Sequence, residues 1–421
     1  MVLPNHPTLE SASSFYSRPQ VQVELVPIGP GVPLGIERVS NPAVGIAGAY
    51  GAWGESYDND HLPALVAERI GAPLPPNERL NLAELGFENR HHLTGLSDSE
   101  MVELEVQVGA RFLREAAAAN GWSISDVQGV LVGLTGPASV DYTEQIARQA
   151  GIPDEALKVS IHKACDGSVA GLNLALNPEL AIQNSLGQNL AETLRGKKVL
   201  VGGIEGLSRL LRPSHDKNAQ QLFGNGAGFI GLIPGETMKF LVGAAREVFD
   251  EEGVLQVHMF YPHSGLHIEG QSMIEVFQTG LNHLHLAGLM HEPTGIDPVS
   301  MAGPMGMVKL FVRSGVQVVR EVYESYQKRL VELDMQGKSI AVAIVHHANY
   351  KINQLKEKNL LKEGINIPMP WLVKDFGNVS AASNMIAFLR ELSSLKPGDH
   401  VLFDGFGAGT YYDAIAVELG G

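Results

Sequence analysis

The strongest constraint on this chain is a regular alternation of short apolar runs, several of them ended by glycine, with longer amphipathic stretches. The apolar runs cover residues 44–51, 130–134, 198–203, 226–234, 339–345, 370–376 and 400–407. The amphipathic stretches include residues 98–120, 143–151, 167–178 and 381–394. Runs this short predict strands, and the longer periodic stretches predict helices. Strands that alternate with helices favour a layered α/β fold.

Two parts of the chain depart from this alternation. Residues 1–43 are rich in Pro, Ser and Gly and have weak periodicity, which predicts an N-terminal arm on the surface rather than a folded domain. Residues 235–338 mix helical runs such as 315–334 with loops rich in Met, His and Pro. No linker composition flanks this second segment, so we interpret it as an insertion or an elaborated connection rather than a separate domain.

The charge balance argues against several classes of partner. The chain has 421 residues and a net charge of −15, which repels nucleic-acid phosphates and anionic lipids. No basic patch large enough to overcome this field is visible, and no apolar run reaches the roughly 18 residues of a membrane span. The N-terminus has neither a basic start nor an apolar core of a signal peptide. We therefore expect a cytoplasmic protein that binds neither nucleic acid nor membrane.

The single cysteine, Cys165, lies where an apolar strand-like run meets a small-residue helix start, in the sequence KVSIHKACDGSVAG. One cysteine excludes an intramolecular disulfide and a multi-thiolate metal site. A thiol at the positive end of a helix dipole is expected to have a lowered pKa, which is typical of a nucleophile. The alternative is a buried cysteine that only packs in the core.

Polar side chains follow two later strand-like runs. His346, His347 and Asn349 follow residues 339–345, and Asn378 follows residues 370–376; both groups precede a predicted helix. Because functional sites in α/β sheets form where the carboxyl ends of strands meet, we expect these groups to lie near Cys165.

Five segments together resemble beta-ketoacyl-ACP synthase III and its relatives in the thiolase superfamily. They are ACDGSVAG around Cys165, FGNGAG (223–228), HHAN (346–349), GNVSAAS (377–383) and GFGAGTYYDAIAV (405–417), in the family's order. LGFENRHH (85–92) resembles the family's early glycine-arginine segment. The resemblance implies a thiolase-like duplicated α-β-α-β-α layered fold, active as a homodimer. The nucleophile would lie in an N-terminal half, residues 44–234, and the His and Asn in a C-terminal half, residues 235–421.

The resemblance also assigns roles. Cys165 would be the acylated nucleophile, His346 the histidine of the H-x-A-N motif and Asn378 the asparagine of the N-x-S-A-A-S motif. The backbone N–H groups of Gly409 and Cys165 would form the oxyanion hole. His347 could replace His346 only if the register were shifted, and its alternative role is a packed or surface imidazole.

Other chemistries are disfavoured by the residue types. Thiolases resemble one another in using a second cysteine as a base, and this chain has one cysteine. His283, His285 and His291 lack an acidic or thiolate partner at ligand spacing, so no metal site is predicted. No cofactor is expected beyond the thioester substrate, which would be an acyl-CoA or an acyl carrier protein thioester.

This chain differs from the family at positions that bind the carrier of the thioester, which is either coenzyme A or an acyl carrier protein. Prototypical members have a tryptophan and an arginine that hold coenzyme A, and the corresponding residues here are Leu80 and Glu84. Lys351 matches a basic carrier-docking position, and Asn349 and Lys358 complete the side expected to face a carrier protein or its phosphopantetheine arm. Lys356 and Lys362 lie on the same predicted helix.

The leading hypothesis is a condensing enzyme that joins an acyl thioester to a malonyl-type thioester with loss of CO₂, in specialised lipid or polyketide metabolism. One alternative is an acyltransferase that passes the acyl group from Cys165 to a hydroxyl or an amine. Another is a catalytically silent carrier-binding subunit. The residues Met259, Phe260, Tyr261, Met290 and Met301 are further predicted to line an adaptable acyl channel, or else to pack a larger core.

Overall fold

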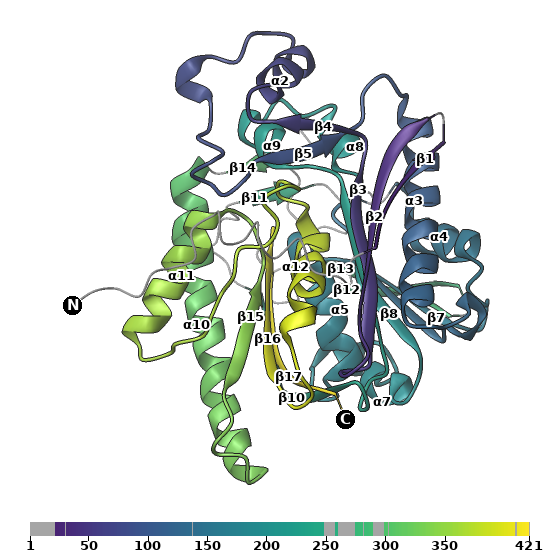
Figure 1. The fold of residues 1–421 in the computed structure, drawn as a ribbon, viewed down its shortest axis with the longest axis vertical. Helices are drawn as coiled ribbons and strands as arrows, with labels where there is room; N and C mark the ends of the chain where they lie inside the picture. The colour runs from purple at the N-terminus through teal and green to yellow at the C-terminus, as the bar shows by residue number, and fades with distance from the viewer. Residues whose placement is uncertain are drawn as a thin grey trace.

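The computed structural model describes residues 22–29, 31–136, 138–247, 257–259, 274–280, 282–288, 299–301, 303–408 and 411–420. Within this part of the chain the fold has two main sheets with helices between them and on both outer faces (Figure 1). No helix in the described ranges is long and apolar enough to cross a membrane.

The larger sheet has nine strands. In spatial order they are β1 (Gln22–Ile28), β2 (Val32–Asn41), β3 (Ile46–Trp53), β9 (Gly226–Leu232), β8 (Val199–Glu205), β6 (Gly129–Gly133), β7 (Leu157–His162), β13 (His283–Gly288) and β12 (Ile274–Gly280). The central strands β8, β6 and β7 run parallel to one another. Their carboxyl ends therefore meet at one edge of the sheet.

The second sheet has four strands, in the order β10 (Met238–Glu247), β17 (Tyr411–Leu419), β16 (His400–Gly407) and β15 (Ile340–Val345). Strands β15 and β16 are parallel, and β17 is antiparallel to both of its neighbours. Two small ribbons pair β4 (Glu55–Asp58) with β5 (Asn89–His92) and β11 (Val257–Met259) with β14 (Val299–Met301).

Six helices of the described part form three layers around the two main sheets. Helices α3 (Asp98–Ala119) and α4 (Tyr142–Ala150) cover the outer face of the large sheet, and α10 (Gly303–Glu332) and α11 (Tyr350–Lys362) cover that of the small sheet (Figure 1). Helices α5 (Gly167–Leu176) and α12 (Ser383–Glu391) lie between the sheets and contact both. The remaining α-helices of the described ranges are α2 (Leu62–Ile70), α6 (Ile182–Ser185), α7 (Leu190–Leu194), α8 (Leu207–Leu211) and α9 (Lys217–Leu222).

The sequence of α5, GSVAGLNLAL, explains its central position. Every residue of this helix is buried, and its residues are small or apolar apart from Ser168 and Asn173. A helix that is apolar all round needs to be covered on all sides, which two enclosing sheets provide. The layered thiolase-like fold predicted from the sequence is confirmed, and Cys165 lies directly before this central helix.

Two predicted elements differ from the structure. Residues 22–28 and 32–41, which we expected to be part of a surface arm, form the hairpin β1–β2, and β2 pairs with β3 from Leu34 to Asn41. Backbone hydrogen bonds with β3 stabilise this hairpin, although its own sequence has only a weak strand pattern. Residues 370–376 form no regular strand; Lys374 O accepts the backbone N–H of Glu88 at 2.6 Å, and an isolated bridge between Phe223 and Asn378 follows this segment.

The segment 235–338 is only partly an elaboration. Strand β10 and helix α10, both inside it, are elements of the second sheet and of the layer that covers it. Strands β12 and β13 extend the large sheet beyond β7. The boundaries of the two halves remain a prediction, and residues 1–21 lie outside the described residues.

Candidate functional site

The cysteine lies at the edge where the parallel strands of the large sheet end. Strand β7 leads into a 3₁₀ turn, η4 (Ala164–Asp166), and then into α5. Ala164 has a φ of 47°, a left-handed conformation that is uncommon for a residue with a side chain. This sharp turn between strand and helix places Cys165, which is partly accessible, at the carboxyl end of β7.

The thiol does not have the lowered pKa that the helix start led us to expect. Burial of the sulfur raises the pKa of Cys165 to about 12, and a hydrogen bond from Ser380 opposes this rise only in part. Desolvation therefore outweighs the helix dipole at this position. The thiol needs a group that accepts its proton.

Asn378 is held in place by backbone hydrogen bonds with Leu222 and with Gly224 of the FGNGAG segment. Asn378 N donates to Leu222 O at 2.8 Å, and Gly224 N donates to Asn378 O at 3.1 Å. Its Oδ1 accepts the N–H of Ser380 at 2.9 Å, so the NH₂ end of the amide is the end that can donate to another molecule. The glycine-rich FGNGAG segment thus supports the position of Asn378.

His346 lies at the end of β15, beside the start of α12. Its Nδ1 is 2.6 Å from Ser383 Oγ, and its ring packs at 4.9 Å and 80° against Phe406. Burial, helped by the positive charge of Lys356, holds the pKa of His346 well below its usual range. The imidazole is therefore neutral near pH 7.

One turn of chain brings the cysteine and the histidine together. Ser380 Oγ donates to Cys165 Sγ at 3.1 Å, and Ser383 Oγ contacts His346. The two serines are three residues apart, in η5 (Ser380–Ala382) and at the start of α12. Cys165, His346 and Asn378 are thus gathered around residues 378–383.

The buried carboxylate of Glu205, at the end of β8, also contacts the turn of residues 378–383. The sequence analysis did not predict this residue. Glu205 Oε1 accepts hydrogen bonds from Thr135 Oγ1 at 2.6 Å and from Ala381 N at 3.0 Å. Thr135 follows β6, and its hydroxyl is hydrogen-bonded to that of Ser380. The signal that could have identified both residues is their position, since Thr135 follows β6 and Glu205 ends β8, two parallel strands of the same sheet as β7.

Comparison with known proteins identifies proteins to which this chain is similar. Residues 330–419 match the family description "3-Oxoacyl-[acyl-carrier-protein (ACP)] synthase III C terminal". Beta-ketoacyl-[acyl-carrier-protein] synthase III 1 of Halalkalibacterium halodurans is 25% identical over 341 residues, which cover 80% of this chain and 88% of that protein. The chain is thus similar to the synthase III condensing enzymes of the thiolase superfamily.

Solved structures show the same fold. Beta-ketoacyl synthase III from Thermus thermophilus superposes on this synthase III-like chain with a TM-score of 0.60 and 18% identity, covering 87% of this chain and 96% of the other. A type III pentaketide synthase from Neurospora crassa superposes with a TM-score of 0.59 and 17% identity, covering 90% and 99%.

His347, the second histidine of HHAN, contacts residues 370–372 rather than Ser383. Nε2 of His347 lies 3.2 Å from Pro370 O and 3.1 Å from Leu372 N, and its ring packs 4.6 Å from that of Trp371. Burial lowers the pKa of His347 to about 3. These contacts give His347 a packing role in this synthase III-like chain, away from Ser383 and His346.

The proposed oxyanion donor Gly409 lies outside the described residues, but the strand that leads to it is described. Gly407, at the end of β16, approaches the turn of the nucleophile so closely that a Cβ there would lie 3.0 Å from Cys165 N and 2.5 Å from Lys163 O. Only glycine fits this contact. The end of β16 is thereby packed against the backbone of Cys165.

The carrier-facing residues are spread over α11. Asn349 caps this helix by accepting the N–H of Ile352 at 3.0 Å, and Lys351 forms an exposed ion pair with Glu84 at 2.6 Å. Lys358 is exposed. Lys356, however, is fully buried and paired with Asp404, so it is not available on the surface. Leu80 is partly exposed.

The histidines considered for a metal form no such site in the part that the structure describes. His283 Nε2 contacts Ser160 Oγ at 2.8 Å, and Thr279 Oγ1 lies 2.8 Å from His285 Nε2. No group of three His, Cys, Asp or Glu residues able to hold a metal ion is found among the described residues. His291 lies outside them, as do Phe260, Tyr261 and Met290.

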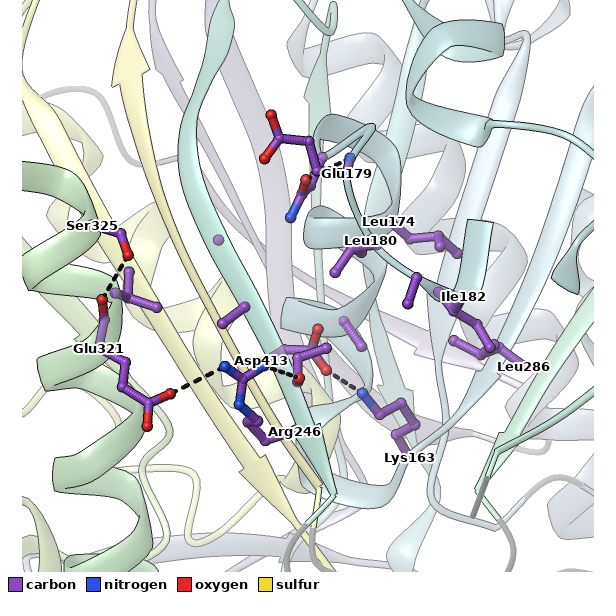
Figure 2. Close-up of a pocket in the computed structure, with 17 residues that line it drawn as sticks. Lys163, Leu174, Glu179, Leu180, Ile182, Arg246, Leu286, Glu321, Ser325 and Asp413 are labelled. Carbon is purple, nitrogen blue, oxygen red and sulfur yellow. Dashed lines mark hydrogen bonds and ion pairs between the residues drawn. The ribbon is translucent and has the colours of Figure 1, made fainter. Parts of the chain in front are cut away.

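A separate pocket of about 620 Å³ lies beside the loop of the nucleophile (Figure 2). Its wall includes the buried ion pair of Lys163 with Asp413 and, on the neighbouring strand β10, Arg246, which is bonded to Glu321 at 3.1 Å. Lys163 precedes Cys165 by two residues, but the cysteine does not line this pocket. The pocket is thus a neighbour of the candidate site rather than part of it.

Proposed function

We propose that the chain forms a carbon–carbon bond between an acyl group carried on Cys165 and a malonyl-type thioester that loses CO₂. The acyl thioester first transfers its acyl group to the sulfur. The second thioester then loses CO₂, and the resulting enolate carbon attacks the acyl carbonyl, which releases a β-keto thioester and free Cys165.

The observation that carries this proposal is the convergence of Cys165, His346 and Asn378 on the one turn of residues 378–383. A thiol can hold an acyl chain, and two nearby donors can hold an enolate oxygen. The synthase III relatives and the synthase folds described above support the same chemistry.

The histidine acts as a neutral hydrogen-bond donor in this scheme. A Ser383 hydroxyl that donates to Nδ1 leaves the ring proton on Nε2, and the low pKa keeps the imidazole uncharged. Nε2–H and the NH₂ group of Asn378 then donate to the thioester carbonyl as CO₂ leaves. Loss of CO₂ itself supplies the carbanion, so no strong base is needed for this step.

The acyl donor and the malonyl donor are thioesters of coenzyme A or of an acyl carrier protein, and the enzyme works as a homodimer in specialised lipid or polyketide metabolism. Lys351, Lys358 and Asn349 form the carrier side of the entrance. The replacement of the family's tryptophan and arginine by Leu80 and Glu84 favours a carrier protein, because the ion pair of Glu84 with Lys351 occupies that position.

Intact-protein mass spectrometry tests the proposal. The wild-type chain and the variant Cys165→Ala are exposed to a panel of acyl-CoA and acyl-carrier thioesters, with and without malonyl thioesters. We expect an acyl adduct on the wild type alone, which disappears when the malonyl donor is added. An adduct on Cys165→Ala would refute the role of the cysteine.

The same experiment separates the alternatives. An adduct that disappears only with a hydroxyl or amine acceptor would indicate an acyltransferase. A chain that never forms an adduct, yet binds the carrier protein, would indicate a silent carrier-binding subunit.

A further inference from the structure

A continuous chain of hydrogen bonds links the thiol of Cys165 to a buried carboxylate. Ser380 Oγ lies 3.1 Å from Cys165 Sγ, the hydroxyls of Ser380 and Thr135 are bonded to each other, and Thr135 Oγ1 lies 2.6 Å from Glu205 Oε1. Ser380, Thr135 and Glu205 are all buried, with exposed fractions of 2% or less. Bulk water therefore does not compete for these hydrogen bonds.

From this geometry we infer that Glu205 accepts the thiol proton of Cys165 through the hydroxyls of Ser380 and Thr135. The inference rests on the proposed function for its role in acylation, since it supplies the proton acceptor which that step needs. Nothing in the resemblance of the sequence to synthase III assigned a role to Glu205 or Thr135.

The transfer balances atom by atom. In the structure the Ser380 hydroxyl donates to Cys165 Sγ, so the relay begins when this hydroxyl turns to donate to Thr135 Oγ1 and leaves its oxygen free to accept the thiol proton. The S–H bond of Cys165 then breaks, its proton passes to Ser380 Oγ, the Ser380 proton passes to Thr135 Oγ1, and the Thr135 proton passes to Glu205. The electron pair of the S–H bond stays on sulfur, which attacks the acyl carbonyl carbon. When the tetrahedral adduct collapses, the departing thiolate takes the proton back along the same chain. Both hydroxyls end each turnover as they began.

The environment of Glu205 suits a group that both accepts and returns a proton. Burial raises the pKa of Glu205 to about 8, and the bonds from Thr135 and Ala381 N moderate that rise. A carboxylate with an ordinary pKa would be a poor acceptor, because proton transfer works best when the acceptor titrates near the working pH.

Other charged groups near Glu205 are already engaged. On the far side of Gly206, Glu105 from α3 is bonded to Arg209 from α8 at 3.1 Å and to Tyr142 from α4 at 3.0 Å. Glu105 is a buried carboxylate of the same type that has no hydrogen bond to the chain leading to Cys165. It therefore provides a matched control.

The test uses alkylation of the folded protein by iodoacetamide, which reports on one site because the chain has one cysteine. For the wild type, the rate should rise with pH and level off above about 8, as Glu205 ionises. In Glu205→Gln this inflection should vanish. The alkylation rate at pH 8 should fall by at least about tenfold, which is less than the roughly 10²–10⁴-fold that a general base typically contributes. Glu105→Gln should keep the wild-type profile.

The sign of the change distinguishes the relay from a simple charge effect. The negative charge of Glu205 by itself raises the pKa of Cys165, so a variant that only loses this charge would react faster. Faster alkylation of Glu205→Gln, or an unchanged profile, would overturn the inference.

A second pair of variants guards against misfolding of Glu205→Gln. Thr135→Val removes the hydroxyl and keeps the shape, whereas Thr135→Ser keeps the hydroxyl. Thr135→Ser should retain the inflection and Thr135→Val should lose it; equal profiles would overturn the relay. Because alkylation needs no thioester, a wild type that never forms an acyl adduct would refute the proposed function while this profile still decides the relay.

Discussion

Replacing Lys356 by methionine should strongly destabilise the fold, although this lysine lies on a helix that faces solvent. Its side chain and that of its partner Asp404 are both 0% exposed, and its Nζ lies 4.5 Å from the ring centroid of Phe406. Gly315 on α10 provides the space, since a Cβ there would lie 2.7 Å from Lys356 Nζ.

The expected loss of stability follows from the charge of Asp404, which loses its partner in the variant. Lys356 Nζ donates to Asp404 Oδ2, and Asp404 Oδ1 has no hydrogen-bond partner among the described residues, so Lys356→Met leaves a buried carboxylate without compensation. Breaking a buried pair in this way costs about 3–5 kcal/mol. Burial already raises the pKa of Asp404. In the variant the carboxyl group is stable in its protonated form, so the cost should shrink as the pH falls and grow as it rises.

Chemical denaturation of three variants measures this. Lys356→Met should lose about 3–5 kcal/mol of unfolding free energy at pH 7, and the double variant Lys356→Met/Asp404→Leu should recover most of it. Lys351→Met is the matched control on the same helix: its ion pair with Glu84 is exposed, so about 0–1 kcal/mol is expected. A loss below about 1 kcal/mol for Lys356→Met would refute the reasoning.

Three further predictions concern the reaction. Asn378→Ala should slow decarboxylation of the malonyl thioester by about 10²–10³-fold, the value of one oxyanion donor, and leave acylation nearly intact; equal losses in both steps would contradict its role. Ser383→Ala should slow the same step, because it frees Nδ1 of His346 to carry the ring proton, and an unchanged rate would show that this hydroxyl does not set the tautomer. Charge reversal at Lys351 and Lys358 should slow turnover with carrier-bound thioesters, more at low salt than at high salt, and spare small thioester mimics. Equal slowing with the mimics would remove the carrier-docking role.

Most of the layered fold could be predicted because its strands and helices carry strong local patterns. The apolar runs 130–134 and 400–407 and the stretch 98–120 correspond closely to β6, β16 and α3. The hairpin of residues 22–41 could not be predicted in the same way. Its strands contain prolines and depend on pairing with β3, a contact that local pattern does not encode.

The site was predictable in its residue types but not in its electrostatics. The rule that polar groups gather at the carboxyl ends of strands indicated Cys165, His346 and Asn378, and the structure places all three around one turn. The same rule applied to β6 and β8 would have indicated Thr135 and Glu205. Burial was the missing quantity: it raises the pKa of the thiol, against the expected effect of the helix.

A single-turnover experiment tests the central claim most directly. The protein is acylated on Cys165, freed of excess donor and mixed with a malonyl thioester labelled in its free carboxyl group. The adduct on the protein and the labelled CO₂ are then measured in the same samples over time. The account predicts that one CO₂ is released for each acyl group lost, with the β-keto thioester as product. Loss of the acyl group without CO₂, or CO₂ release while the acyl group stays on Cys165, would contradict it.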